Sequence, residues 1–191
     1  MISKAGRIYL FTCHSFLSVL QIYHDFQYVN NYTSWISEYE NIIGWLLEEF
    51  VFPLEHENLD DDLFSSLDEE GEKAGDSIAL MIMTGLGLVR DTDENSFSTN
   101  KENYVGYCLV VLAILDKFTT LLSTPPLQGT KYQQNFYANK VPFSKLKQAI
   151  SKSIEAVKPK IDNVEYLQLS QLAEELGRKW LEHVNIVGKM K

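Results

Sequence analysis

Apolar residues recur every three or four positions along most of the chain, which is the spacing of one face of an α-helix. Glycines, prolines and short polar runs interrupt the pattern. The pattern predicts a mainly α-helical protein with helices over about 3–28, 34–52, 72–84, 103–122, 143–158 and 164–186, and a short acidic amphipathic helix that ends at 68–71. For residues 127–142 we expect an extended loop that closes at Pro142.

Three of the predicted helices have distinct apolar surfaces. The segment 104–115 (YVGYCLVVLAIL) is the longest apolar run, but it is too short to span a bilayer and predicts a buried core helix. The helix that starts after Ser34 has a stripe made of Ile36, Tyr39, Ile43, Leu46, Leu47 and Phe50. The basic helix over 143–158 has a stripe made of Phe143, Leu146, Ile150, Ile154 and Val157.

The stretch TGLGLVRDTDENSFSTNKEN, residues 84–103, follows an apolar helix and contains a polar turn. Its glycines end the helix, and Leu88 and Phe97 are placed to anchor two short strands on either side of that turn. Three helices followed by such a strand–turn–strand unit resemble the winged-helix fold over about residues 40–103. The resemblance implies a winged-helix-like core with a short β-hairpin wing, to which the C-terminal helices are added.

The same stretch has part of the spacing of a calcium-binding loop. Oxygen-bearing side chains occupy its positions 1, 3, 5 and 12, namely Asp91, Asp93, Asn95 and Glu102. Position 6, where the sharp turn requires glycine, is Ser96, and the position that packs into the domain is Ser98. The spacing therefore favours a polar turn over a calcium site, and we predict no metal and no cofactor.

Charge divides the chain into two parts. Residues 1–126 contain 20 acidic and 6 basic residues, whereas residues 127–191 contain 6 acidic and 11 basic ones, within a chain of net charge −9. We therefore predict an acidic helical or winged-helix-like domain over 1–126 and a basic C-terminal helical segment over 127–191 that packs on it. The candidates for non-specific contact with nucleic acid are Lys145, Lys147, Lys152 and Lys158.

The acidic part is unsuited to DNA at the usual face of a winged helix. The third predicted helix offers Lys73 against several acids, and these would repel phosphates. The fold resemblance instead extends to the accessory subunits of SMC-like and related ABC-ATPase complexes, namely kleisin-binding winged-helix proteins and middle components of bacterial defence systems. It implies a non-enzymatic accessory or scaffold subunit whose partner is a larger protein, such as an SMC-like ATPase. The expected partner-binding residues are Ile78, Met81, Met83, Leu88 and Phe97.

Two alternatives use the C-terminal part. The string LSQLAEELGRKW resembles the first half of a helix-turn-helix, with Leu172 and Leu176 inward and a turn at Gly177, which would make the protein a DNA-binding regulator. The string RKWLEH resembles the Arg-x4–6-His motif of HEPN-type ribonucleases, in which Arg178 and His183 would be catalytic. A second match to that spacing, Arg7 with His14, lies in an aromatic-rich segment and has a structural interpretation.

The two cysteines, Cys13 and Cys108, lie inside apolar runs and have no partner at a ligand spacing. They predict small buried hydrophobic residues in a reducing compartment. We therefore expect a soluble, cytoplasmic protein that does not associate with a membrane and does not act as an enzyme.

Overall fold

The computed structural model describes residues 4–29, 36–46, 48, 65–66, 69–71, 73–77, 80, 84, 101–125 and 127–189. The prediction of a mainly α-helical protein is confirmed for these residues, among which no strand occurs. The predicted wing and the expected partner-binding residues Ile78, Met81, Met83, Leu88 and Phe97 lie outside them. The aspartates of the calcium-like spacing also lie outside, whereas Glu102 stands in the first turn of a helix.

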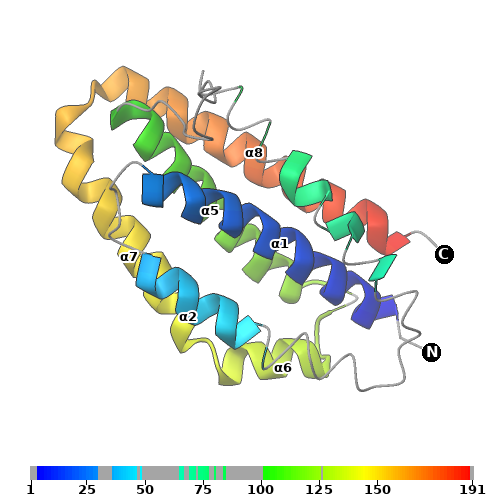
Figure 1. The fold of residues 1–191 in the computed structure, drawn as a ribbon. Helices are drawn as coiled ribbons and strands as arrows, with labels where there is room; N and C mark the ends of the chain where they lie inside the picture. The colour runs from blue at the N-terminus through cyan, green and yellow to red at the C-terminus, as the bar shows by residue number, and fades with distance from the viewer. Residues whose placement is uncertain are drawn as a thin grey trace.

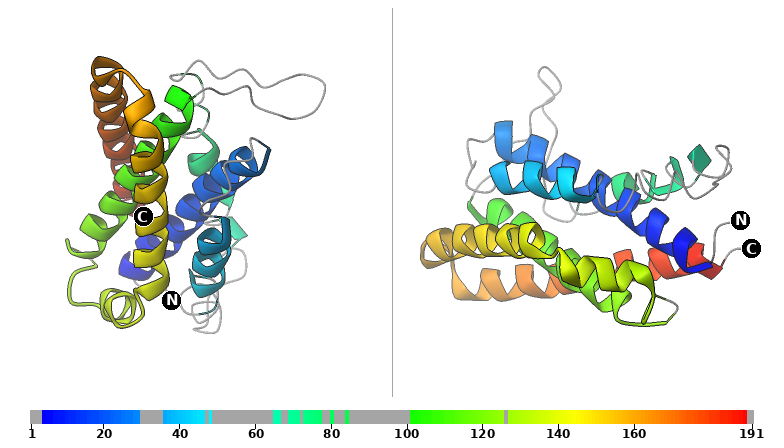
Figure 2. Two further views of the ribbon diagram at one scale, coloured as in Figure 1. Left: turned by 90° about the vertical axis from the view of Figure 1, so that its left-hand side faces the viewer. Right: turned by 90° about the horizontal axis from the view of Figure 1, so that it is seen from below.

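The helices form a bundle in which neighbours are mostly antiparallel (Figures 1 and 2). They are α1 (Lys4–Val29), α2 (Ile36–Leu46), α5 (Lys101–Leu122), α6 (Lys131–Ala138), α7 (Val141–Val157) and α8 (Asn163–Lys189), with a short 3-10 helix η2 (Lys158–Lys160) before α8. Helix α5 packs along α8 and against α7, and α1 packs against α8 and α2. The start of α1 and the end of α8 lie at the same end of the bundle.

The expected loop over 127–142 is wrong, because residues 131–138 form α6. Tyr132 and Phe136, one turn apart, are buried on its inner face, and this contact compensates for its short, polar sequence. The turn before α6 contains Gly129, whose φ of 75° suits glycine. Pro142 stands in the first turn of α7, where its missing N–H is not needed.

A cluster of aromatic side chains joins five helices in the core. The ring centroid of Phe118 in α5 lies 5.0 Å from that of Phe16 in α1 and 5.8 Å from that of Phe143 in α7. Phe136 of α6 and Trp45 of α2 complete the cluster, with centroids 5.5 Å apart. Since offset and tilted ring pairs stabilise beyond their burial, these contacts hold the N-terminal and C-terminal segments around one core.

Helix α5 is the central element of that core. Among the described residues, one stretch has the length and apolar composition of a membrane-spanning helix, Tyr104–Leu122, and 61% of it is buried within the protein. Such burial is characteristic of the core helix of a soluble protein. The prediction of a buried core helix over 104–115 is confirmed.

Helix α8 is continuous through Gly177, so the turn predicted there is wrong. A Cβ added at Gly177 would lie 3.0 Å from the Cβ of Ala113, which shows that the glycine allows α8 to approach α5 closely. Leu176 is buried and Leu172 is partly buried, as expected. The string that resembles the first half of a helix-turn-helix is therefore one face of a long helix.

A second close approach joins α1 to the acidic segment. Residues 69–71 and 73–77 are helical, which agrees with the helix expected over 72–84, whereas the helix end expected at 68–71 stays a prediction because residue 72 lies outside the described residues. A Cβ at Gly71 would lie 2.5 Å from the Cβ of His14, and one at Gly75 would lie 2.5 Å from the Cβ of Ser18. The Ser18 hydroxyl donates a 2.7 Å hydrogen bond to Asp76 Oδ1. These two glycines thus fit the acidic segment against α1.

A candidate binding groove between α2 and α7

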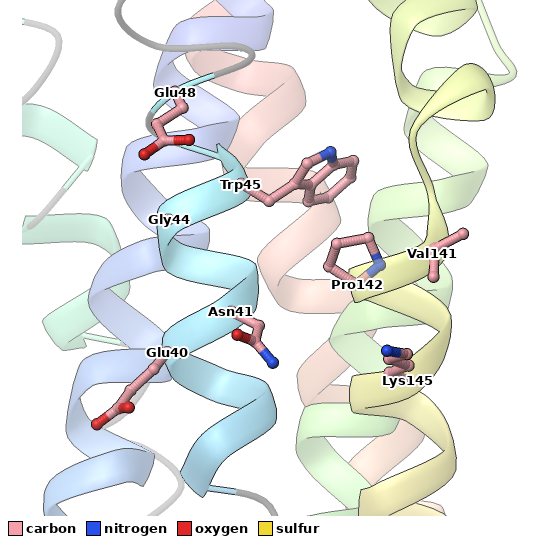
Figure 3. A pocket seen from close by; sticks show the side chains of 8 residues that line it. All are labelled: Glu40, Asn41, Gly44, Trp45, Glu48, Val141, Pro142 and Lys145. Carbon is pink, nitrogen blue, oxygen red and sulfur yellow. The ribbon is translucent and has the colours of Figure 1, made fainter.

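A groove of about 460 Å³ lies between α2 and the start of α7, two elements that run antiparallel (Figure 3). Its walls come from segments about a hundred residues apart in the sequence. Four of the side chains are charged or amide groups, and the others are small or apolar. The lining residues are Glu40, Asn41, Gly44, Trp45, Glu48, Val141, Pro142 and Lys145.

The α2 wall depends on which face of that helix is buried. Ile42 is fully buried and Trp45 is 8% exposed, and neither belongs to the stripe that the sequence predicted. Of that predicted stripe, Ile43 is partly buried against the core, and the other side chains are outside the described set. Ile42 and Trp45 face the core. Gly44 therefore lies on the adjacent face of the helix, which lines the groove.

Trp45 forms part of the floor and is held in place from below. Its ring centroid lies 5.5 Å from that of Phe136 and 6.4 Å from that of Phe143. Asn41 and Trp45 point toward α7 in Figure 3. A bulky side chain packed against two other rings makes this floor a preformed surface.

The α7 wall begins with exposed apolar surface. Val141 is 62% exposed, and Pro142 is half-buried beside it. The fixed φ of this proline and its missing N–H suit the first turn of α7. One turn further on, Lys145 adds an exposed ammonium group.

Charges of opposite sign border the groove. Glu40 and Glu48 are exposed and stand one turn before and one turn after Gly44, about 12 Å apart along α2. Lys145 stands on the opposite wall. In Figure 3 the carboxylates of Glu40 and Glu48 both lie on the side of α2 away from α7, which places them on the outer edge of the groove.

The four lysines proposed for nucleic acid do not share one face of α7. Lys147 Nζ lies 2.8 Å from Asp116 Oδ1 of α5, and Lys158 Nζ lies 4.3 Å from the ring centroid of Tyr166 in α8. Lys145 and Lys152, which are exposed, lie about half a turn around the helix from Lys147. Two of the four lysines are thus engaged within the bundle, and one of the other two lines the groove.

The pair proposed for ribonuclease chemistry is on α8. Arg178 and His183 are both exposed, and neither lines the groove. Their spacing of five residues turns them about 140° apart around the helix axis. In the second match to that spacing, His14 is buried at 7% exposure and packs beside Gly71. The structure therefore does not bring these groups to the groove.

Both cysteines are buried in the core, as predicted. Burial raises the pKa of Cys13 and of Cys108 from 9.0 to about 12, although hydrogen bonding from a neighbouring tyrosine acts in the opposite direction. Such thiols stay protonated and enclosed, which is unsuitable for a nucleophile. Among the described residues, no three His, Cys, Asp or Glu side chains are grouped so that they could hold a metal ion.

Comparison with protein families, with curated proteins and with solved structures finds no match to this chain. The functional interpretation therefore depends on the residues and on the geometry of the site.

Sequence reasoning identified one groove residue, Lys145, and missed the others. The strongest local signal was Gly44, which stands inside the helical string ISEYENIIGWL. Glycine in a helix interior is unfavourable by about 0.5–1 kcal/mol relative to alanine, so its presence there calls for a packing or binding reason. The position of α7 opposite this glycine could not be inferred from either segment alone.

Proposed function

We propose that the protein is a non-enzymatic accessory subunit that binds another protein in the groove between α2 and α7. The observation that carries this proposal is the groove itself, with its aromatic floor, its exposed Val141 and its charged edges. Protein-binding surfaces commonly combine a rigid aromatic or apolar centre with a polar rim.

The chemistry of the lining supports binding over catalysis. The backbone positions of Glu40 and Glu48 are about 12 Å apart along one helix, and both side chains are exposed to solvent, unlike two carboxylates that are held together over one bond. A general base also needs a partner group within hydrogen-bonding reach of the reacting atom. Separated surface charges instead suit recognition of complementary charges on a partner.

The partner class expected from the sequence fits this proposal. A kleisin-like helix or a helical segment of an SMC-like ATPase would supply a compact element for the groove. In this proposal α2 belongs to the acidic winged-helix-like core with its hairpin wing, and the basic segment 127–191 contributes the opposite wall. A cytoplasmic location remains part of the same proposal.

The decisive test blocks the groove without disturbing the core. We expect Gly44→Leu to fold, because a Cβ at this position meets nothing within 4 Å among the described residues and leucine favours helix. Gln168→Leu, at an exposed position of α8, is the matched control. Tagged proteins expressed in the native host would be captured after photo-crosslinking from Lys145, with the position of the crosslink identified by mass spectrometry.

Wild type and Gln168→Leu should crosslink the same partner, and Gly44→Leu should lose at least about 90% of the product, equivalent to roughly 1.4 kcal/mol of binding. Equal crosslinking by all three proteins would contradict the proposed site. Duplex DNA binding that is lost on Lys145→Ala/Lys152→Ala, or RNA cleavage that is lost on His183→Ala, would favour the regulator or the ribonuclease instead.

A further inference from the structure

We infer that the occupant of the groove is a single α-helix, with a small residue over Gly44, a basic residue one turn to either side of it, and acidic and apolar residues facing Lys145 and Val141. This inference rests on the proposed function and specifies the chemistry of the partner. It follows from three features of the groove: the open space at the Cβ position of Gly44, the regular spacing of two glutamates along α2, and the exposed apolar residue at the start of α7.

The first feature is the contrast between Gly44 and three other helical glycines. At Gly71, Gly75 and Gly177, the space that a Cβ would take is already occupied by atoms of a neighbouring helix within about 3 Å. Each of these glycines therefore marks a close helix–helix crossing. Gly44 is also inside a helix, but the space at its Cβ position is open among the described residues and faces the groove. A second helix could therefore approach α2 closely at Gly44.

The second feature is the spacing of charge along α2. Glu40, Gly44 and Glu48 follow one another at intervals of four residues, so they lie nearly in line along the helix surface. A helix that crosses at Gly44 and runs nearly parallel or antiparallel to α2 presents its own residues at the same interval. Basic side chains four residues before and after its central small residue would then meet the two carboxylates.

The third feature is the difference between the two ends of the α7 wall. Lys145 offers a positive charge, whereas Val141 exposes 62% of its surface. One turn separates them. A docked helix therefore needs an acidic residue toward Lys145 and an apolar residue toward Val141 and Pro142. This asymmetry gives the docked helix one preferred direction.

These features argue against other kinds of occupant. Two carboxylates beside Gly44 would repel nucleic acid phosphates. Addition of a β-strand requires an exposed strand edge, and the described residues contain no strand. A helix satisfies its own backbone hydrogen bonds, so it is suited to a groove whose walls are both helical.

The test uses the full chain and synthetic helices of about 18 residues, a length at which an alanine-rich peptide forms helix. The first peptide has arginine four residues before and after a central alanine, with glutamate and leucine on the adjacent edge. In the second peptide, glutamates replace the two arginines. In the third, proline replaces the central alanine. Affinity is measured by fluorescence anisotropy at physiological salt.

The expected result for the wild type is a preference of about tenfold for the arginine peptide over the glutamate peptide, as two exposed ion pairs exchanged for repulsion would give. The proline peptide should bind at least about tenfold more weakly than the arginine peptide, because proline breaks the helix. Glu40→Lys/Glu48→Lys should reverse the charge preference. Glu175→Lys/Glu182→Lys, which makes the same change of net charge on exposed positions of α8, should not.

A reversal is a gain of binding, so it cannot arise from misfolding. Equal binding of the arginine and proline peptides, or no reversal in the α2 double variant, would overturn the helix inference. If Gly44→Leu still abolished crosslinking of the native partner in that case, the proposed function would stand with a non-helical occupant. If Gly44→Leu changed neither measurement, both proposals would fail.

Discussion

Two sides of the bundle use the same residue types in opposite ways. Where α1 and α5 meet α8, the indole of Trp180 is fully buried and its Nε1 donates a 2.9 Å hydrogen bond to the Ser15 hydroxyl. Between α2 and α7, Trp45 rests on core rings and lines an open groove. The space at the Cβ position of Gly177 is occupied by Ala113, whereas the space at the Cβ position of Gly44 is open among the described residues.

The difference shows how local sequence acquires its meaning from the neighbouring helix. A mid-helix glycine costs helix stability wherever it occurs, and a close crossing with another helix compensates for that cost. On the α8 side the compensation is present within the chain. On the α2 side a partner would have to provide it, which makes the comparison between the two sides a test of function.

The largest expected effect is at Trp180. Trp180→Ala removes a fully enclosed side chain and should lower the free energy of unfolding by about 3–5 kcal/mol, measured by urea denaturation. Trp180→Phe keeps part of the ring volume but loses the hydrogen bond to Ser15, so its loss should be smaller. A loss below about 1 kcal/mol for Trp180→Ala would show that this side is not tightly packed.

Alkaline pH should weaken the same side. The thiols of Cys13 and Cys108 ionise near pH 9.0 when exposed and near 12 when buried, so the unfolded state binds fewer protons between these values. Stability is therefore complete below about pH 9 and falls above it, by roughly 2–3 kcal/mol between pH 8 and pH 10. Urea titrations at a series of pH values would measure this.

The control for the alkaline effect is Cys13→Ala/Cys108→Ala, which should be less stable at pH 8 but should lose little more by pH 10. The comparison stops at pH 10 because burial also raises the pKa of Tyr9 and of Tyr107, which would add losses of the same sign at higher pH. An identical decline in the wild type and the double variant would contradict the role of the thiols.

Sequence predicted the features whose signal is repeated within one segment, and it missed those that depend on a neighbouring helix. Helix α7 was predicted because its stripe, which includes Phe143, Leu146 and Ile150, is repeated over several turns. Helix α6 was missed because its eight residues bury two side chains, too few for a periodic signal. At Gly177 a turn and a close helix crossing have the same local sequence, and the position of Ala113 decides between them. The groove was missed because it depends on which helix lies opposite α2.

The next effect compares alanine substitutions at two glycines whose Cβ positions are both occupied by atoms of a neighbouring helix. In Gly75→Ala the new Cβ would lie 2.7 Å from the backbone oxygen of Ser15, which cannot rotate away, so the free energy of unfolding should fall by about 1–3 kcal/mol. In Gly177→Ala the nearest atom is a methyl carbon at 3.0 Å, and the better helix propensity of alanine offsets part of the strain. Urea denaturation should therefore rank Gly75→Ala as the more damaging change, and the opposite ranking would contradict this account of the α1 contact.

The smallest expected effect has the opposite sign and bears most directly on function. Gly44→Ala should raise the free energy of unfolding by about 0.5–1 kcal/mol, because the added methyl group meets nothing within 4 Å among the described residues and alanine favours helix. The same methyl group would separate α2 from a helix crossing at this position, so partner crosslinking from Lys145 should decrease, though less than in Gly44→Leu. A gain of stability together with a loss of binding is expected where a glycine is retained for a contact outside the chain. Stabilisation with unchanged crosslinking would instead indicate that Gly44 has no part in recognition, and the two sides of the bundle would then differ in packing alone.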